Sequence, residues 1–202
     1  HEFGGRVDLD RVVLVGHSRG GEAVSEAALF NRLSAYPDDA TLDFDFNFGL
    51  RGIIAIAPVD AQYKPRGRDT DVRDTNYLVI HGSHDGDVTS FAGSATYSRV
   101  EFDACRDCFK TGFYLIGANH GQFNTSWGDS DMSLPMSTRL DRAHLISGED
   151  QRAVAATLFA AFLEAAVHGR DDYRAFLAQP DRAHALLPAG ARYLTQYRDA
   201  RQ

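Results

Sequence analysis

Cysteine and long apolar runs are scarce in this chain of 202 residues. The two cysteines, Cys105 and Cys108, form one Cys-x-x-Cys pair, which is a weak zinc signal without a second pair. The pair does not open a helix after a strand, as a redox motif would, so a short-range disulfide or two free thiols are the alternatives. A disulfide would suit an exported protein. No stretch approaches about 18 consecutive apolar residues, so no membrane-spanning helix is expected.

Positive charge is also in deficit, because the formal net charge is −7. Nucleic-acid-binding proteins need a basic face to neutralise phosphates, and this sequence supplies none, so we expect no nucleic-acid partner. Hydrophobic residues make up 44% of the chain, which suffices for one globular domain with a substantial core. No internal repeats or low-complexity tracts interrupt it.

The most informative segment present is an apolar run that ends in Gly-x-Ser-x-Gly at residues 16–20. A strand that turns sharply into a helix, with Ser18 at the apex, is the nucleophile-elbow pattern. Side chains at Gly16 and Gly20 are expected to collide across this strained turn. The turn exposes the serine hydroxyl at a helix N-terminus, where backbone N–H groups can face developing negative charge.

Short apolar segments predict the strands that surround this turn. They do not alternate in polarity, and helices or long loops separate them, which indicates a parallel sheet covered on both faces. We therefore expect an α/β fold with right-handed crossovers and with the strands in chain order across the sheet. The expected strands are 11–15, 52–57, 77–81 and 112–117, and the expected helices are 20–35, 88–103, 149–168 and 171–178.

Three of these strands end in the residue types of a hydrolytic triad. Ser18 follows the first strand, Asp85 follows the third in Gly-x-x-Asp-x-x-Val, and His120 follows the fourth in Gly-Ala-Asn-His. The order Ser, Asp, His is the chain order of the α/β-hydrolase triad and differs from the two protease orders. On these motifs, residues 7–168 resemble the α/β-hydrolase superfamily. Within it, they look similar to the serine esterases of the cutinase, polyester-hydrolase and chlorophyllase type.

The resemblance implies a role for each of these residues. Ser18 would be the nucleophile, which stays weak until a base takes its proton. His120 would be that base and would return the proton to the leaving group. Asp85 would fix the imidazole tautomer and stabilise the imidazolium. The backbone N–H of Arg19 would be one oxyanion donor.

Two alternatives to this scheme concern the loop of Asp85. Asp87 could serve as the acid in its place, although the family spacing favours Asp85. His84, Asp85 and Asp87 could instead form a metal cluster, which is the less favoured interpretation. The triad itself implies no metal and no other cofactor.

Residues that line a substrate cleft are less well defined by the sequence. Val59 and Tyr63 follow the second strand and are candidates for the cleft, with ordinary loop packing as the alternative. Phe123 and Trp127 follow His120 and could form an apolar wall for an acyl group. Met132 and Met136 are weaker candidates for the same wall.

Strands that the superfamily places before the elbow are not found in this sequence. The second oxyanion N–H comes from a loop after one of those early strands. Only one strand precedes Ser18, and its outer edge would be open, which is unfavourable for a soluble protein. We therefore expect residues 1–180 to be the C-terminal part of a hydrolase domain and residues 181–202 to be a tail or the start of another segment. The missing N-terminal part is the expected partner.

The function predicted from these features is the hydrolysis of carboxylic esters, small or polymeric, through an acyl-enzyme. A non-catalytic module of the same fold that binds a ligand or partner is one alternative. Another acyl-transfer or peptidase activity on the same triad is a second. The residues of the expected cleft are too generic to name an acyl group.

Overall fold

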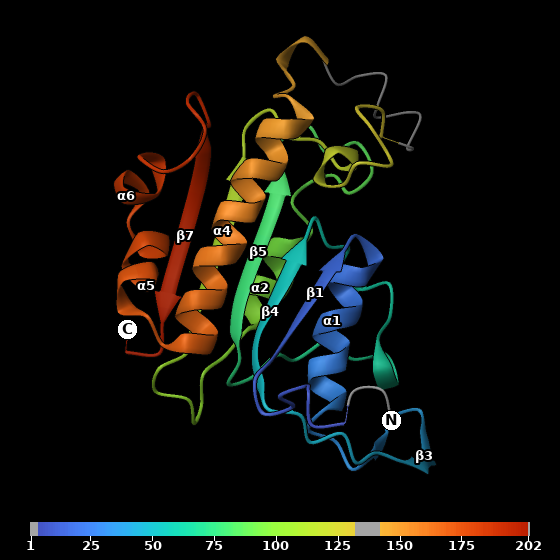
Figure 1. The fold of residues 1–202 in the computed structure, drawn as a ribbon. Helices are drawn as coiled ribbons and strands as arrows, with labels where there is room; N and C mark the ends of the chain where they lie inside the picture. Colours follow the sequence, from blue (N-terminus) through green and yellow to red (C-terminus); the bar gives the residue numbers. More distant parts are fainter. Residues whose placement is uncertain (1–3, 132–141, 202) are drawn as a thin grey trace.

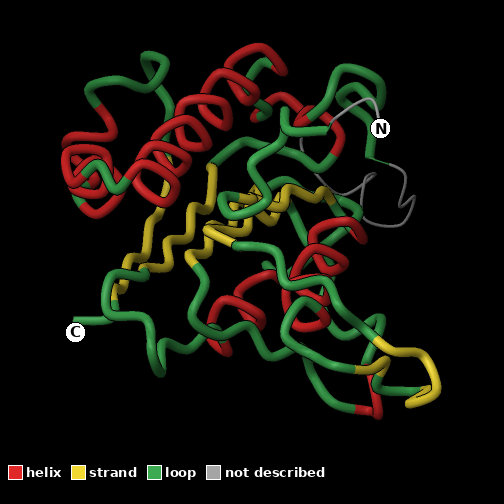
Figure 2. Tube along the Cα trace, turned by 60° about the horizontal axis from the view of Figure 1, so that its bottom comes forward, coloured by secondary structure: helices red, strands yellow, loops and turns green. Residues whose placement is uncertain are grey.

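A five-stranded sheet lies between two layers of helices in the computed structural model, which describes residues 4–131 and 142–201 (Figures 1 and 2). The first four strands are parallel, and the last pairs antiparallel with its neighbour. This mostly parallel sheet, in the expected strand order, confirms the predicted α/β fold class. Across the sheet the strands are β1 (Val12–His17), β4 (Leu50–Ile56), β5 (Asn76–Gly82), β6 (Phe109–Leu115) and β7 (Tyr193–Asp199).

Helices cover both faces of the sheet because each strand carries apolar side chains on both sides. Ile53 and Ala55 of β4 face α1 and α2, whereas Ile54 faces α4. Ser147 begins α4 by accepting the N–H of Asp150 at 3.0 Å. The helices on one face are α1 (Arg19–Phe30) and α2 (Gly93–Arg99), those on the other are α4 (Gly148–His168) and α5 (Asp171–Ala178), and α6 (Pro180–His184) follows.

Three predicted elements had boundaries wrong by three or more residues, and one of them is α2, which spans Gly93–Arg99 rather than 88–103. Helix α1 ends at Phe30 because the chain then forms a small hairpin of β2 (Ala35–Tyr36) and β3 (Asp39–Asp43). Strand β6 begins before the predicted residue 112. The boundary was placed too late because a charged residue, Lys110, is the second residue of the strand and interrupts its apolar pattern. The ammonium group of Lys110 is buried and donates to the carbonyls of Tyr97 at 2.8 Å and Val100 at 2.9 Å, so this lysine belongs to a core strand.

Residues 193–199, expected to lie in a tail, form the edge strand β7. Their exposure alternates along the strand, with Thr195 and Tyr197 less exposed than Leu194, which is 66% exposed. Tyr193 and Tyr197 pack against the core on the side of α4 and α5. The alternation with period two is the ordinary mark of a strand with one solvent-facing side.

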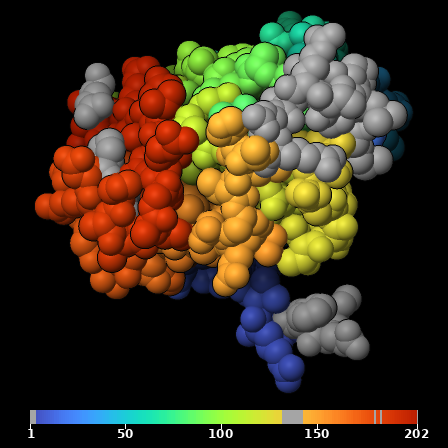
Figure 3. Space-filling model, turned by 90° about the horizontal axis from the view of Figure 1, so that it is seen from above, coloured from blue at the N-terminus to red at the C-terminus, as the bar shows by residue number. Residues whose placement is uncertain are grey.

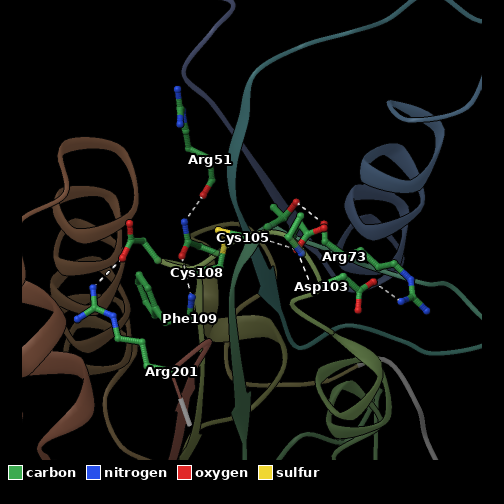
Figure 4. The surroundings of a disulfide bond; sticks show 12 residues. Arg51, Arg73, Asp103, Cys105, Cys108, Phe109 and Arg201 are labelled. Atoms are coloured by element: carbon green, nitrogen blue, oxygen red, sulfur yellow. Dashed lines mark hydrogen bonds and ion pairs between the residues drawn. A yellow bond between two sulfur atoms is a disulfide. The ribbon is translucent and has the colours of Figure 1, made fainter.

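The disulfide of Cys105 and Cys108 lies at the start of β6, at the edge where the parallel strands begin (Figure 4). It decides between the two alternatives left open for these cysteines. The carboxylate of Asp74 accepts the N–H groups of Asp103, Ala104 and Cys105, each at 2.8 Å, and so fixes the turn before the bond. These contacts secure the entry into β6 and therefore the position of the whole strand.

The opposite edge, where the parallel strands end, lies at the top of Figure 1. The segments that follow β5 and β6 and the start of α4 form the surface there, in green, yellow and orange in Figure 3. Among the described residues, no helix is both long and apolar enough to span a bilayer.

Candidate active site

Ser18 occupies the sharp turn between β1 and α1 with a left-handed backbone, at φ 60° and ψ −123°. Its N–H donates to the carbonyl of Ile56 at 2.9 Å, and its carbonyl accepts from the N–H of Gly21 at 2.9 Å. A non-glycine residue in such a conformation costs about 1–3 kcal/mol, which the surrounding bonds must offset. The expected strained elbow is therefore present, with Ser18 at the apex.

Two glycines make this turn possible, but they are not the two that were expected. A Cβ at Gly16 would collide with the carbonyl of Gly20, and a Cβ at Gly21 would lie 2.7 Å from the Cβ of Pro58. A Cβ at Gly20 would meet nothing within 4 Å outside its own helix turn. The expectation for Gly20 was wrong, because this position faces away from β1 and β4.

Asp85 and His120 are brought together from the loops after β5 and β6. Oδ2 of Asp85 lies 2.8 Å from Nδ1 of His120, and both residues are buried. Oδ1 of Asp85 accepts the N–H of Asp87 at 3.0 Å and of Val88 at 2.6 Å, so the carboxylate is held on both sides. Since a carboxylate oxygen only accepts, Nδ1 of His120 carries the proton and Nε2 is left as the acceptor.

The pKa of His120 is raised above the ordinary histidine value of 6.5. Burial on its own would lower this pKa, because desolvation disfavours the imidazolium. The hydrogen bond and charge of Asp85 outweigh burial, and the charges of Asp87 and Asp131 act in the same direction. The site therefore stabilises a positive charge on His120, as a general base requires.

Three aromatic rings meet beside Ser18. The ring of His17 lies 4.5 Å from that of His120 and 5.0 Å from that of Trp127, and Trp127 is nearly parallel to His120 at 5.8 Å. Burial and the neighbouring His120 lower the pKa of His17 to about 4. His17 is thus uncharged near neutral pH.

The expected contact between Ser18 and His120 is not formed in this arrangement. Among residues 4–131 and 142–201, no hydrogen bond joins Oγ of Ser18 to Nε2 of His120. The ring of His17, the residue before Ser18, nevertheless lies 4.5 Å from the His120 ring, which places the elbow beside His120. Catalytic hydrogen bonds are often long or poorly aligned before substrate binds.

The candidate substrate residues fall into two places. Phe123 and Trp127 both lie against His17, the former edge-on at 6.0 Å. Val59 lies next to the elbow, since its N–H donates to the carbonyl of Ser18 at 3.3 Å. Met132 and Met136 lie outside the described residues.

Tyr63 lies on the other side of the elbow, along α1. Its hydroxyl bonds that of Tyr36 at 2.6 Å and donates to Asp38 at 3.1 Å. With Arg19 and Phe30 it lines a groove of about 440 Å³ that runs along α1. Tyr63 is therefore placed with Arg19 rather than with Phe123 and Trp127.

His81 is fully buried near the end of β5. Nε2 of His81 lies 2.7 Å from the carbonyl of Val88 and 3.5 Å from Oδ2 of Asp85. A carbonyl only accepts, so Nε2 carries the proton and donates. Burial lowers the pKa of His81, which keeps it neutral behind the carboxylate.

Asp131 was not predicted as part of the site. It is buried and accepts the N–H of His120 at 3.0 Å and of Gly86 at 2.7 Å. A single aspartate in a polar loop gives no spacing signal, so only the folded arrangement shows this contact. Within the described parts of the chain, no group of three His, Cys, Asp or Glu is placed to hold a metal ion.

No protein-family model and no curated protein matches this sequence. Among solved structures, the chain is similar to MGS-M1, an alpha/beta hydrolase enzyme from a Medee basin deep-sea metagenome library. The identity is 15% and the TM-score is 0.41, over 79% of this chain and 55% of that chain. This chain therefore spans little more than half the length of that protein.

Proposed function

We propose that this chain is a serine hydrolase that cleaves carboxylic esters through an acyl-enzyme. The observation that carries the proposal is the buried hydrogen bond between Asp85 and His120 beside a strained elbow serine. Because Asp85 holds the proton on Nδ1, Nε2 of His120 can take the proton of Ser18. Ser18 then attacks the ester carbonyl, and His120 protonates the departing alcohol. In the second half of the reaction, His120 takes a proton from water, and the water oxygen attacks the acyl carbonyl. The acid leaves, and His120 returns the proton to the oxygen of Ser18.

Stabilisation of the oxyanion rests on the start of α1. The N–H of Arg19 is the first of the helix and has no acceptor within its own helix, because it precedes the first full turn. In this position it can donate to an oxygen that becomes negative as Ser18 attacks. We propose that Phe123 and Trp127 form the wall for the acyl group, because both lie beside His17 and His120. Val59 and Tyr63 would line the opposite side of the cleft.

Ester turnover is expected to fall as the pH decreases through the pKa of His120. Only neutral imidazole can accept the serine proton, so the acidic form is inactive. Since Asp85 raises this pKa, the half-maximal point of kcat/KM should lie above pH 6.5, the ordinary histidine value. The measurement is p-nitrophenyl acetate hydrolysis from pH 4 to 9. A rate that is flat between pH 5 and 8 would contradict His120 as the base.

We further propose that another segment pairs with the outer edge of β1 and supplies the second oxyanion N–H. Within the described residues β1 pairs only with β4, and Val15 of β1 is 54% exposed. The N–H and C=O groups on the open edge of a parallel sheet have no partners in a neighbouring strand. The expected occupant is the N-terminal part of the hydrolase domain, as part of the same polypeptide or as a separate chain.

Supplying that segment is expected to raise kcat by about 10²–10³, the usual effect of one oxyanion donor. The comparison is between residues 1–202 alone and the same residues together with the upstream segment, with p-nitrophenyl acetate as substrate. Hydrogen exchange at Val12–His17 should slow when the segment is present, because the N–H groups of β1 would then be bonded. Equal activity and equal exchange in both forms would contradict this part of the proposal.

A further inference from the structure

The carboxylate of Asp131 is buried and accepts four N–H groups. Oδ2 accepts the backbone N–H of Gly86 at 2.7 Å and of His120 at 3.0 Å. Oδ1 accepts the backbone N–H of Gly121 and the side-chain amide of Asn119, both at 2.9 Å. A carboxylate offers about four lone-pair sites, so this one is fully used. Bonds of N–H groups to a charged oxygen are among the strong ones.

These donors come from the two loops that carry the proposed acid and base. Gly86 directly follows Asp85 in the loop after β5, whereas Asn119, His120 and Gly121 follow β6. The two loops come from neighbouring strands and are bonded directly where the N–H of His84 donates to the carbonyl of Ala118 at 2.8 Å. One buried side chain, that of Asp131, adds a further link at their tips, between Gly86 and His120. The Asp85–His120 distance of 2.8 Å depends on how these tips are held relative to each other.

The same carboxylate closes the loop that carries Trp127. Residues 119–131 leave β6, pass through Trp127 and return to their own start at Asp131. The return is tight, because a Cβ at Gly121 would lie 2.6 Å from the carbonyl of Gly128. Trp127 is held within this closed loop, with its ring 5.8 Å from His120 and nearly parallel to it.

We propose that Asp131 is a positioning residue that holds the loops of Asp85 and His120 in register and keeps Trp127 against His120. The proposal rests on the proposed function only for its effect on turnover. The negative charge of Asp131 also contributes to the raised pKa of His120, together with the charges of Asp85 and Asp87. Asp131 touches backbone groups of the site and is not itself expected to contact substrate.

Asp131→Asn is the decisive variant because it keeps the size of the side chain but leaves only one of its two terminal atoms able to accept N–H groups. Both oxygens of Asp131 accept N–H groups only, so either orientation of an amide would turn its NH₂ toward N–H donors. Asp129→Asn is the matched control. Asp129 is exposed two residues away and loses the same charge, but among the described residues it bonds only the hydroxyl of Ser130, at 3.4 Å.

Three measurements compare Asp131→Asn with Asp129→Asn. Turnover of p-nitrophenyl acetate should fall about 10–100-fold through kcat, since small displacements of catalytic groups carry costs of this order. The pKa of His120 from the pH profile should decrease. Trp127 is the single tryptophan of the chain, so its emission reports the loop directly and is expected to shift to the red with easier quenching by acrylamide.

Fluorescence separates a failure of this inference from a failure of the proposed function. Protonated imidazole quenches a stacked indole, so Trp127 emission also titrates His120 without any substrate. If the parent protein hydrolyses no ester even with the upstream segment supplied, the function is wrong, and the emission shift and titration still decide the role of Asp131. If Asp131→Asn does not fold, Asn119→Ala removes one of the four donors, together with the bond that Oδ1 of Asn119 accepts from Gln122 at 3.1 Å. This variant keeps the Asp131 charge and should show the changes in turnover and emission at smaller size. Turnover, emission and titration equal to those of Asp129→Asn would overturn the inference.

Discussion

Replacement of Ser18 by alanine is expected to abolish ester hydrolysis while the protein remains folded. Loss of a triad nucleophile removes about 10⁴–10⁶ of kcat, because neither the attack nor the acyl-enzyme can form. Alanine at this position keeps the strained backbone at φ 60° and the three backbone bonds of residue 18, so the melting temperature should change little. The measurement is p-nitrophenyl acetate turnover, with circular dichroism to verify the fold.

Ser98→Ala is the control for that experiment. Ser98 lies exposed on α2, and its hydroxyl bonds only the carbonyl of Ser94, at 2.8 Å, among the described residues. Its removal should leave turnover within about twofold of the parent, as expected for a surface change away from special features. Turnover that persists in Ser18→Ala would show that another group is the nucleophile. In that case the elbow would serve a binding function.

Asp85→Asn is expected to lower kcat by about 10⁴, the order of loss known for the wrong imidazole tautomer. An amide NH₂ in place of Oδ2 would donate to Nδ1 of His120, and the ring proton would then sit on Nε2. That nitrogen could no longer accept the proton of Ser18. The variant also loses the charge that raises the pKa of His120, so any residual activity should extend to lower pH.

Asp87→Asn is the matched control, because Asp87 lies two residues after Asp85 in the same loop. Nδ1 of His120 lies 2.8 Å from Oδ2 of Asp85, whereas Asp87 acts on His120 through its charge. We expect Asp87→Asn to reduce kcat less than tenfold and to lower the pKa of the pH profile slightly. A loss of about 10⁴ in Asp87→Asn with an active Asp85→Asn would reverse the assignment of the acid.

The parallel sheet could be predicted because its strands are short, apolar and bounded by glycine, proline or charge. The same rule missed the beginning of β6, where Lys110 is buried by bonds to carbonyls that only the folded chain brings near. It also missed β7, whose alternating polarity marks an edge strand rather than a core strand. The local sequence pattern thus locates the apolar centres of the strands, and it misses a strand end with a buried charge and a strand with one solvent-facing side.

Only those parts of the site that follow from strand ends and motif spacing could be predicted. The elbow and the loops of Asp85 and His120 follow from residue type and position. The bonds of Asp131 join residues 86, 119, 120 and 121, and no local pattern encodes that convergence. The contact between the rings of His17 and His120 likewise depends on how β1 and the loop after β6 meet in space.

The most direct test of the central claim is to map a fluorophosphonate adduct by mass spectrometry. Such probes react with a serine only when a neighbouring base activates it. Trypsin releases residues 12–19 as one peptide, in which Ser18 is the only serine, so the site is unambiguous. We expect one adduct, on this peptide, that is absent in Ser18→Ala and strongly reduced in Asp85→Asn. An unmodified peptide 12–19 in a protein that hydrolyses esters, or an adduct on another residue, would contradict this expectation.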